Sequence, residues 1–101
     1  MTTEQAKRDL AATIKWLREE HGYPGDSMPR GDRDSGNCPL AIALRKCYPD
    51  KEEIWVGTTL WEWLKDFKRS VEPLPTFAID FVHRFDHLQY PELLAPKEGV
   101  V

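Results

Sequence analysis

Two cysteines and three histidines are the first candidates for catalysis or metal binding in this 101-residue chain, since its loop aspartates are better explained as solvated charges. His83 and His87 lie four residues apart, a spacing that puts both on one face of a helix, where they could bind zinc. The glutamate of the His-Glu-x-x-His hydrolase motif is absent, because Arg84 follows His83. The spacing of Cys38 and Cys47 matches no common zinc finger. We therefore expect no metal and no cofactor.

Cys38 is the candidate nucleophile. Asn37 is a good helix N-cap and would place Cys38 in the first helical turn, where the helix dipole lowers the pKa of a thiol. Catalysis would also need a base, and the sequence places none of the three histidines beside this thiol. A buried cysteine that packs as a small hydrophobic residue is the commoner case. We expect Cys38 to face the core, and a thiol or zinc enzyme using Cys38 and the histidines is the least favoured functional hypothesis.

The spacing of apolar residues predicts three helices. The first covers about residues 4–20 and begins with a capping box formed by Thr2 and Gln5. The second follows Asn37 and contains an apolar run without a polar break, so we expect it to be buried on most of its circumference. It separates the Cα atoms of the two cysteines by about 13 Å, too far for a disulfide. The third helix occupies the segment 75–90.

A short β-hairpin is predicted between the second and third helices. Residues 54–56 favour a strand, and Gly57 with Thr58 could turn the chain into a second strand. Residues 58–69 fit either a strand or a helix by spacing, and we favour the strand.

These elements predict a single α+β domain over residues 1–101, in which about three helices pack with a short antiparallel β-hairpin. Residues 22–36 are expected to form a long polar loop, and residues 95–101 a frayed tail. The expected core residues come from the helices and the hairpin: Leu10, Ile14, Leu17, Leu40, Ala43, Leu44, Cys47, Ile54, Val56, Phe77, Phe81, Val82 and Phe85.

Charge and hydropathy narrow the class of protein. The net charge of -3 argues against a strong electrostatic grip on nucleic-acid phosphates. No apolar run approaches the roughly 20 residues that span a bilayer. The first ten residues contain no hydrophobic signal core. We therefore expect a cytoplasmic protein that does not contact a membrane.

Three segments, CPLAIALRK, IWVGTT and LPTFAIDFVHRFDHLQYPEL, follow one another between about residues 37 and 94. Their marked positions are Cys38-Pro39, Leu74-Pro75, Phe81, Phe85-Asp86 and Tyr90-Pro91. In this order they resemble small uncharacterised proteins of actinobacteria and their bacteriophages. The resemblance implies an α+β fold and a phage or actinobacterial origin. The family carries no established activity, so it supplies no catalytic residue.

Tryptophans are concentrated in one segment, because Trp55, Trp61 and Trp63 lie within nine positions. One face of a strand cannot bury both Trp61 and Trp63 while it also buries Leu60 and Leu64. One of these pairs is therefore expected to be partly exposed, and exposed tryptophan is enriched at binding hot spots. The alternative is that this small domain uses the rings to fill its core.

We predict a non-enzymatic, phage-encoded protein that binds a host or viral protein through a tryptophan-rich surface. The expected partner-binding residues lie in the tryptophan segment and in the polar loop: Trp55, Trp61, Trp63, Phe67, Arg30 and Asp32. A homodimer through the same apolar surface is an alternative. The second hypothesis is a nucleic-acid-binding regulator, because basic residues recur along the first helix at Lys7, Arg8, Lys15 and Arg18.

Overall fold

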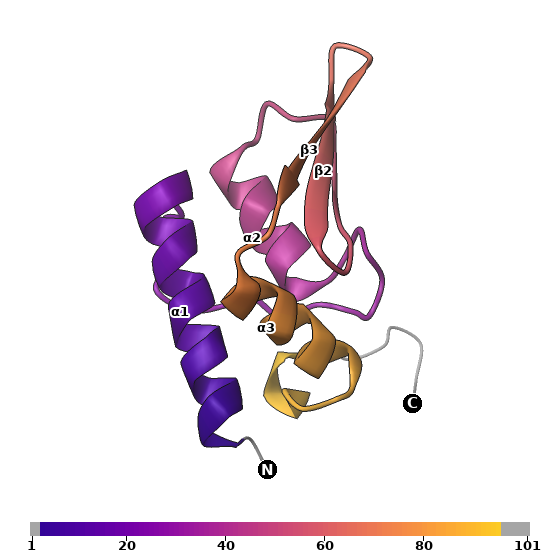
Figure 1. Cartoon of the computed structure of the whole chain (residues 1–101). Coiled ribbons are helices and arrows are strands. Elements are labelled where there is room, and N and C mark those ends of the chain that lie inside the picture. The colour runs from indigo at the N-terminus through magenta and orange to yellow at the C-terminus, as the bar shows by residue number, and fades with distance from the viewer. Residues whose placement is uncertain (1–2, 96–101) are drawn as a thin grey trace.

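A computed structural model, which describes residues 3–95, contains three α-helices and one antiparallel sheet of three strands (Figure 1). The elements follow one another as α1 (Glu4–His21), α2 (Pro39–Cys47), β1 (Glu53–Val56), β2 (Leu60–Lys65), β3 (Lys68–Pro73), α3 (Thr76–Asp86) and a short 3-10 helix, η1 (Pro91–Leu93). The predicted α+β class is confirmed, and a third strand extends the predicted hairpin. No helix within residues 3–95 is long and apolar enough to cross a membrane.

β2 is the central strand of the sheet and pairs antiparallel with both β1 and β3. The two registers align Trp61 with Val56 on one side and with Glu72 on the other. Residues 60–65 are therefore a strand, as favoured from the sequence. β3 was not predicted, because the segment KRSVEP contains one aliphatic residue, Val71, and so lacks an alternating apolar pattern.

The helices pack against one another, and α2 connects them to the sheet. α1 packs against α3, and α2 packs against both α1 and β1. In Figure 1 the β2–β3 hairpin extends beyond the three helices at one end of the molecule. The sheet face toward the helices buries Ile54, Val56 and Trp61, whose side chains are 2%, 3% and 1% exposed.

Both predicted helix caps are shifted by one residue. Thr3 caps α1, because its hydroxyl oxygen accepts a hydrogen bond from the Ala6 amide at 3.1 Å. Thr2 lies outside the described residues. Cys38 caps α2, because its sulfur accepts a hydrogen bond from the Ala41 amide at 3.4 Å. Asn37 does not cap this helix, since its side-chain oxygen accepts from the Arg45 guanidinium and its side-chain NH2 donates to Asp34.

The third helix ends earlier than the sequence predicts, at Asp86 instead of Tyr90. Leu88 follows the helix with a left-handed φ of 61° and is 53% exposed, so it does not belong to the buried face of α3. Tyr90 returns to the core, where its hydroxyl donates to the Ala6 carbonyl at 2.6 Å. Burial, the largest cause, raises the pKa of Tyr90 to about 12.

A largely buried ion pair also joins α1 to α3. Asp9 is 4% exposed and accepts hydrogen bonds from Gln5 and from the Arg84 guanidinium, each at 3.1 Å. The hydrophobic spacing of the two helices gave no indication of this polar contact.

Nine of the thirteen predicted core residues are buried, and four lie at the core's edge. Those four are partly buried: Leu10, Ile14, Cys47 and Phe77. The core also contains large buried residues that the prediction omitted, among them Tyr23, Met28, Trp61, Leu74, Tyr90 and Leu93. Two of these, Tyr23 and Met28, belong to the polar loop, which therefore packs against the core.

The loop 22–36 is fixed at Gly31. The Gly31 amide donates to the Leu93 carbonyl at 2.8 Å, and the Gly31 carbonyl accepts from the Ala95 amide at 2.9 Å. Gly31 forms a parallel bridge with Leu94. The predicted frayed tail lies outside the described residues apart from Ala95.

Replacement of Gly31 by alanine is expected to destabilise the fold. A Cβ atom there would lie 2.4 Å from the Asn37 carbonyl oxygen and 2.7 Å from the Pro39 nitrogen, both rigid backbone atoms. We expect Gly31→Ala to reduce the free energy of unfolding by about 1–3 kcal/mol. Urea unfolding followed by tryptophan fluorescence measures this change.

Gly36→Ala is the matched control, because its Cβ would meet the Trp55 ring at an ordinary 3.7 Å. Its effect should stay within about 0.5 kcal/mol. Equal stability of the two variants would contradict the close packing at Gly31.

Candidate functional site

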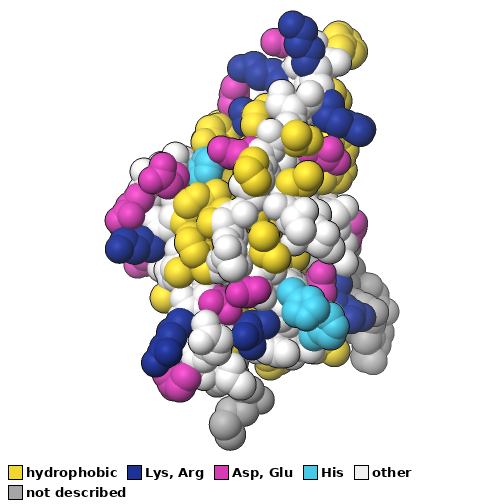
Figure 2. Space-filling view, viewed as in Figure 1, with side chains coloured by type: hydrophobic (Ala, Val, Ile, Leu, Met, Phe, Trp, Pro, Cys, Tyr) yellow, Lys and Arg dark blue, Asp and Glu magenta, His cyan; other side chains and the backbone are white. Residues whose placement is uncertain are grey.

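One face of the sheet is not covered by the helices and carries apolar side chains. Since side chains alternate along a strand, the register that buries Trp61 turns a second set outward. We call this set the outer sheet face: Trp55, Leu60, Glu62, Leu64, Arg69 and Val71. Val71 is 58% exposed and Leu60 is 37% exposed. Hydrophobic and charged side chains alternate along the projecting hairpin in Figure 2.

Charged groups border the apolar residues of the outer sheet face. The Arg69 guanidinium lies 3.9 Å from a Glu62 carboxylate oxygen and 5.7 Å from the centre of the Trp55 ring. Trp55 is half-buried, and the loop at Gly36 lies against it. The face is therefore an apolar patch with balanced charge, a composition typical of protein-binding surfaces.

Phe67 lies at the tip of the β2–β3 hairpin and is 94% exposed. Asp66 and Phe67 form the two-residue turn, and both have positive φ, 51° and 62°. Such a turn favours Asp-Gly or Asn-Gly, because only glycine adopts positive φ without a steric cost. Phenylalanine at the second position strains the backbone and gains no burial, so its presence has no explanation in folding.

The tip is held in place by polar contacts from the segment before β1. A Glu52 carboxylate oxygen accepts a hydrogen bond from the Asp66 amide at 2.8 Å. The Lys65 ammonium forms an ion pair with Asp50 at 2.6 Å, which lowers the pKa of the Asp50 carboxyl. These contacts present the Phe67 ring on a supported turn.

The structure divides the predicted tryptophan-rich surface. Trp61 is 1% exposed, so it belongs to the core and not to the surface. Trp63 is half-buried beside Trp61, with ring centres 4.5 Å apart, whereas Trp55 lies on the opposite face. Of the two residue pairs in β2, the outward pair is therefore the leucines, Leu60 and Leu64, with Leu60 the more accessible. These two leucines and Val71 were not among the partner-binding residues predicted from the sequence.

An aromatic cluster on the inner side holds Trp61 in place. The Trp61 ring is stacked on Tyr48 with centres 5.9 Å apart, and His21 approaches it edge-on at 5.7 Å. The Tyr48 hydroxyl is hydrogen-bonded to His21 at 2.5 Å. Burial is the main cause of the lowered pKa of His21, which the nearby Glu72 carboxylate partly opposes. The cluster joins the ends of α1 and α2 to β2.

The predicted loop residues lie beside a different part of the chain. The Arg30 guanidinium donates to the Leu94 carbonyl at 3.0 Å. Asp32 is exposed, and its amide donates to the Asn37 carbonyl at 2.8 Å. Both residues therefore flank the Gly31–Leu94 bridge, and these hydrogen bonds do not connect them to the hairpin tip.

The chemistry-bearing residues form no recognisable catalytic or metal site within the described part of the chain. Cys38 is 4% exposed, as expected for a core residue, and burial is the largest cause of its raised thiol pKa. His87 is hydrogen-bonded to the backbone carbonyl of His83. Within residues 3–95, no group of three or more histidine, cysteine, aspartate or glutamate side chains could hold a metal ion.

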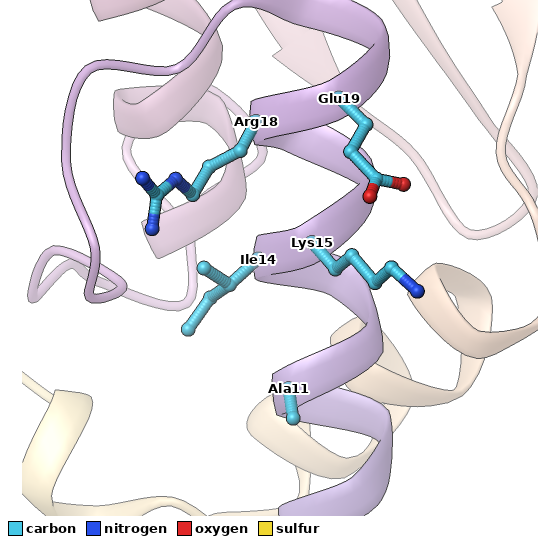
Figure 3. Close-up of a pocket in the computed structure, with 5 residues that line it drawn as sticks. All are labelled: Ala11, Ile14, Lys15, Arg18 and Glu19. Atoms are coloured by element: carbon cyan, nitrogen blue, oxygen red, sulfur yellow. The ribbon is translucent and has the colours of Figure 1, made fainter.

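Open hollows lie at two places on the described surface, one along α1 and one between α3 and the residues around Thr58. The hollow of about 500 Å³ in Figure 3 is lined by residues of α1 alone: Ala11, Ile14, Lys15, Arg18 and Glu19. In this view Ile14 and Arg18 point to one side of the helix, and Lys15 and Glu19 to the other. Two smaller hollows of about 200 and 330 Å³ share Thr58, Val82 and Asp86, and the first also borders Cys38.

Comparisons with protein families, with curated proteins and with solved structures find no match to this chain.

Cys38 is expected to resist alkylation in the folded protein, because its thiol is buried and its pKa is raised. Cys47 is half-buried and should react first with iodoacetamide at pH 8. A Cys47→Ser variant isolates the Cys38 reaction, which mass spectrometry can follow with and without urea. Labelling of folded Cys38 as fast as that of unfolded Cys38 would instead indicate a reactive thiol.

Phe67→Gly is expected to stabilise the fold. Glycine relieves the positive φ of the turn, and the exposed ring contributes no burial. The net gain after the added chain entropy of glycine should be about 0.5–1 kcal/mol. Thermal unfolding by circular dichroism measures this gain as an increase in Tm of a few degrees.

Leu88→Gly is the matched control, since Leu88 is also exposed and has a φ of 61°. It should stabilise the fold for the same reason. A Tm of Phe67→Gly below that of the wild type would show that the ring packs against the fold.

Proposed function

We propose that this protein is a non-enzymatic, cytoplasmic binding protein that docks on another protein through the outer sheet face and the hairpin tip. The observation that carries the proposal is the distribution of exposed large hydrophobic side chains. Of the four that are exposed among the described residues, three belong to the β2–β3 hairpin: Leu60, Phe67 and Val71. Apolar side chains gathered on one projecting element are typical of interaction sites.

The charge of the same region supports a protein as the partner. Residues 50–73 contain six acidic residues (Asp50, Glu52, Glu53, Glu62, Asp66 and Glu72) and four basic residues (Lys51, Lys65, Lys68 and Arg69). Nucleic-acid binding depends on many cations that contact phosphates and release their counterions. A surface with more acidic than basic residues does not provide them. Glutamates also flank the basic residues of α1 at both ends of the helix, as in the Lys7–Glu4 pair at 3.8 Å. Nucleic-acid binding therefore has less support than protein binding.

The size of the outer sheet face favours a partner of concave shape. Three strands about 4.8 Å apart, with about 3.3 Å per residue, give a flat face of about 300 Å². A stable interface buries about 800 Å² on each partner. A second copy meeting this face alone would bury too little surface for a stable dimer. A groove that encloses both the face and the tip would bury more. The sequence resemblance favours a host or viral protein in that role.

Lysine substitutions on the outer sheet face test the proposal. In the double variant Leu60→Lys/Val71→Lys, each added ammonium would have to be desolvated in the interface, while the ammonium at position 71 would face Glu62 favourably in the free protein. We expect at least a tenfold loss of affinity for the partner, first captured from cell extract and then purified for calorimetry.

Leu88→Lys provides the control, because Leu88 is exposed but lies outside the hairpin. It should bind like the wild type, and all variants should have the same far-ultraviolet circular dichroism spectrum. Unchanged affinity of the double variant would refute the proposed surface.

A further inference from the structure

The hairpin tip has features that folding does not require. Phe67 combines nearly full exposure with a positive φ that phenylalanine rarely adopts. The Asp-Gly turn that would relieve this strain differs from the present sequence at one residue. A costly conformation at a fully exposed aromatic residue points to an interaction made outside this chain.

The tip is also preorganised for insertion. Lys65 and Asp66, on either side of the turn's start, contact Asp50 and Glu52 respectively. Because these contacts hold the turn before a partner arrives, less conformational entropy is lost when the Phe67 ring enters a pocket. The turn that contains Phe67 joins β2 to β3, and in Figure 1 this hairpin extends beyond the helices.

The charged residues beside the Phe67 ring indicate which charges a complementary pocket on a partner would carry. Lys68 directly follows Phe67, is exposed and makes no ion pair among the described residues. Arg69 follows and is only loosely paired, 3.9 Å from Glu62. By contrast, Lys65 is neutralised by Asp50. β3 therefore places two exposed cations next to the ring, Lys68 and Arg69, on opposite faces of the hairpin.

We infer that Phe67 inserts into an apolar pocket of the partner protein, and that carboxylates on the rim of this pocket contact Lys68 and Arg69. This inference rests on the proposed function and adds the residue that anchors the complex and the chemistry of its receptor. Electrostatic complementarity of this kind increases the association rate and orients the two surfaces. An extended polyanion, such as a nucleic acid or an anionic membrane, would also meet the acidic residues of segment 50–73, whereas the rim of a pocket can place its carboxylates beside Lys68 and Arg69 alone.

Photocrosslinking from defined positions tests the inference. p-Benzoylphenylalanine replaces Phe67, Val71 or Leu88 in three separate full-length proteins, which are irradiated in extract of the source cells. We expect the probe at position 67 to form a crosslink to one protein, and the probe at position 88 to form none. Peptide sequencing by mass spectrometry should place the crosslink at apolar residues with aspartate or glutamate nearby.

A charge reversal provides the second readout. With the crosslinked protein purified, Lys68→Glu should weaken its binding at least tenfold at low salt, whereas Lys46→Glu on α2 should not. The difference between wild type and Lys68→Glu should shrink as sodium chloride is added, since salt screens exposed charges.

The outcomes separate the inference from the proposed function. A crosslink from position 71 but not from 67 would overturn the inference and leave the outer sheet face as the interface. Crosslinks to nucleic acid or lipid, or to a site with basic residues at its rim, would overturn the inference as well. Failure of both positions 67 and 71 to crosslink would overturn the proposed function too.

Discussion

The burial of Trp61 is the constraint on which the outer sheet face depends. Its ring is 1% exposed, is stacked on Tyr48, and donates its indole N–H to Glu72 at 2.9 Å. A shift of β2 by one residue would move this ring to solvent and bury Leu60 or Leu64 in its place, at a large cost. The strand therefore has one acceptable register, and that register leaves the smaller apolar residues outside. An exposed apolar face of the sheet follows directly from the way in which the core is filled.

The charged residues of the hairpin oppose aggregation through its exposed edge strand. An exposed edge strand with apolar side chains can pair with other chains, and natural sheets oppose this with charged residues, especially lysine, and with proline. β3 is an edge strand, and its six residues include Lys68, Arg69 and Pro73. The Arg69–Glu62 pair places charge within the outer sheet face itself. These residues oppose association of the strand with copies of itself.

The sequence predicted the fold where the patterns are long and regular. Helical spacing located α1 and α2 closely, and alternation around Trp61 and Trp63 predicted that one of two residue pairs would be exposed. Alternation cannot tell which face meets the core, because that depends on Tyr48 and His21, which are distant in sequence. β3 and its turn escaped prediction for a local reason. The turn at Asp66 and Phe67 contains no glycine, so the usual signal of a tight hairpin is missing.

The residues with the most reactive side chains serve the fold, whereas the candidate binding residues have no reactive groups. At Cys38 the helix N-terminus supplies backbone amide hydrogen bonds from Ala41 and Leu40, which favour the thiolate. Burial of the thiol outweighs them, so the pKa rises. Burial also disfavours the charged form of His21. It lowers the pKa of the imidazole and favours the neutral ring within the aromatic cluster. The reactive groups of Cys38 and His21 therefore lie in or beside the core, whereas Phe67 combines exposure with backbone strain.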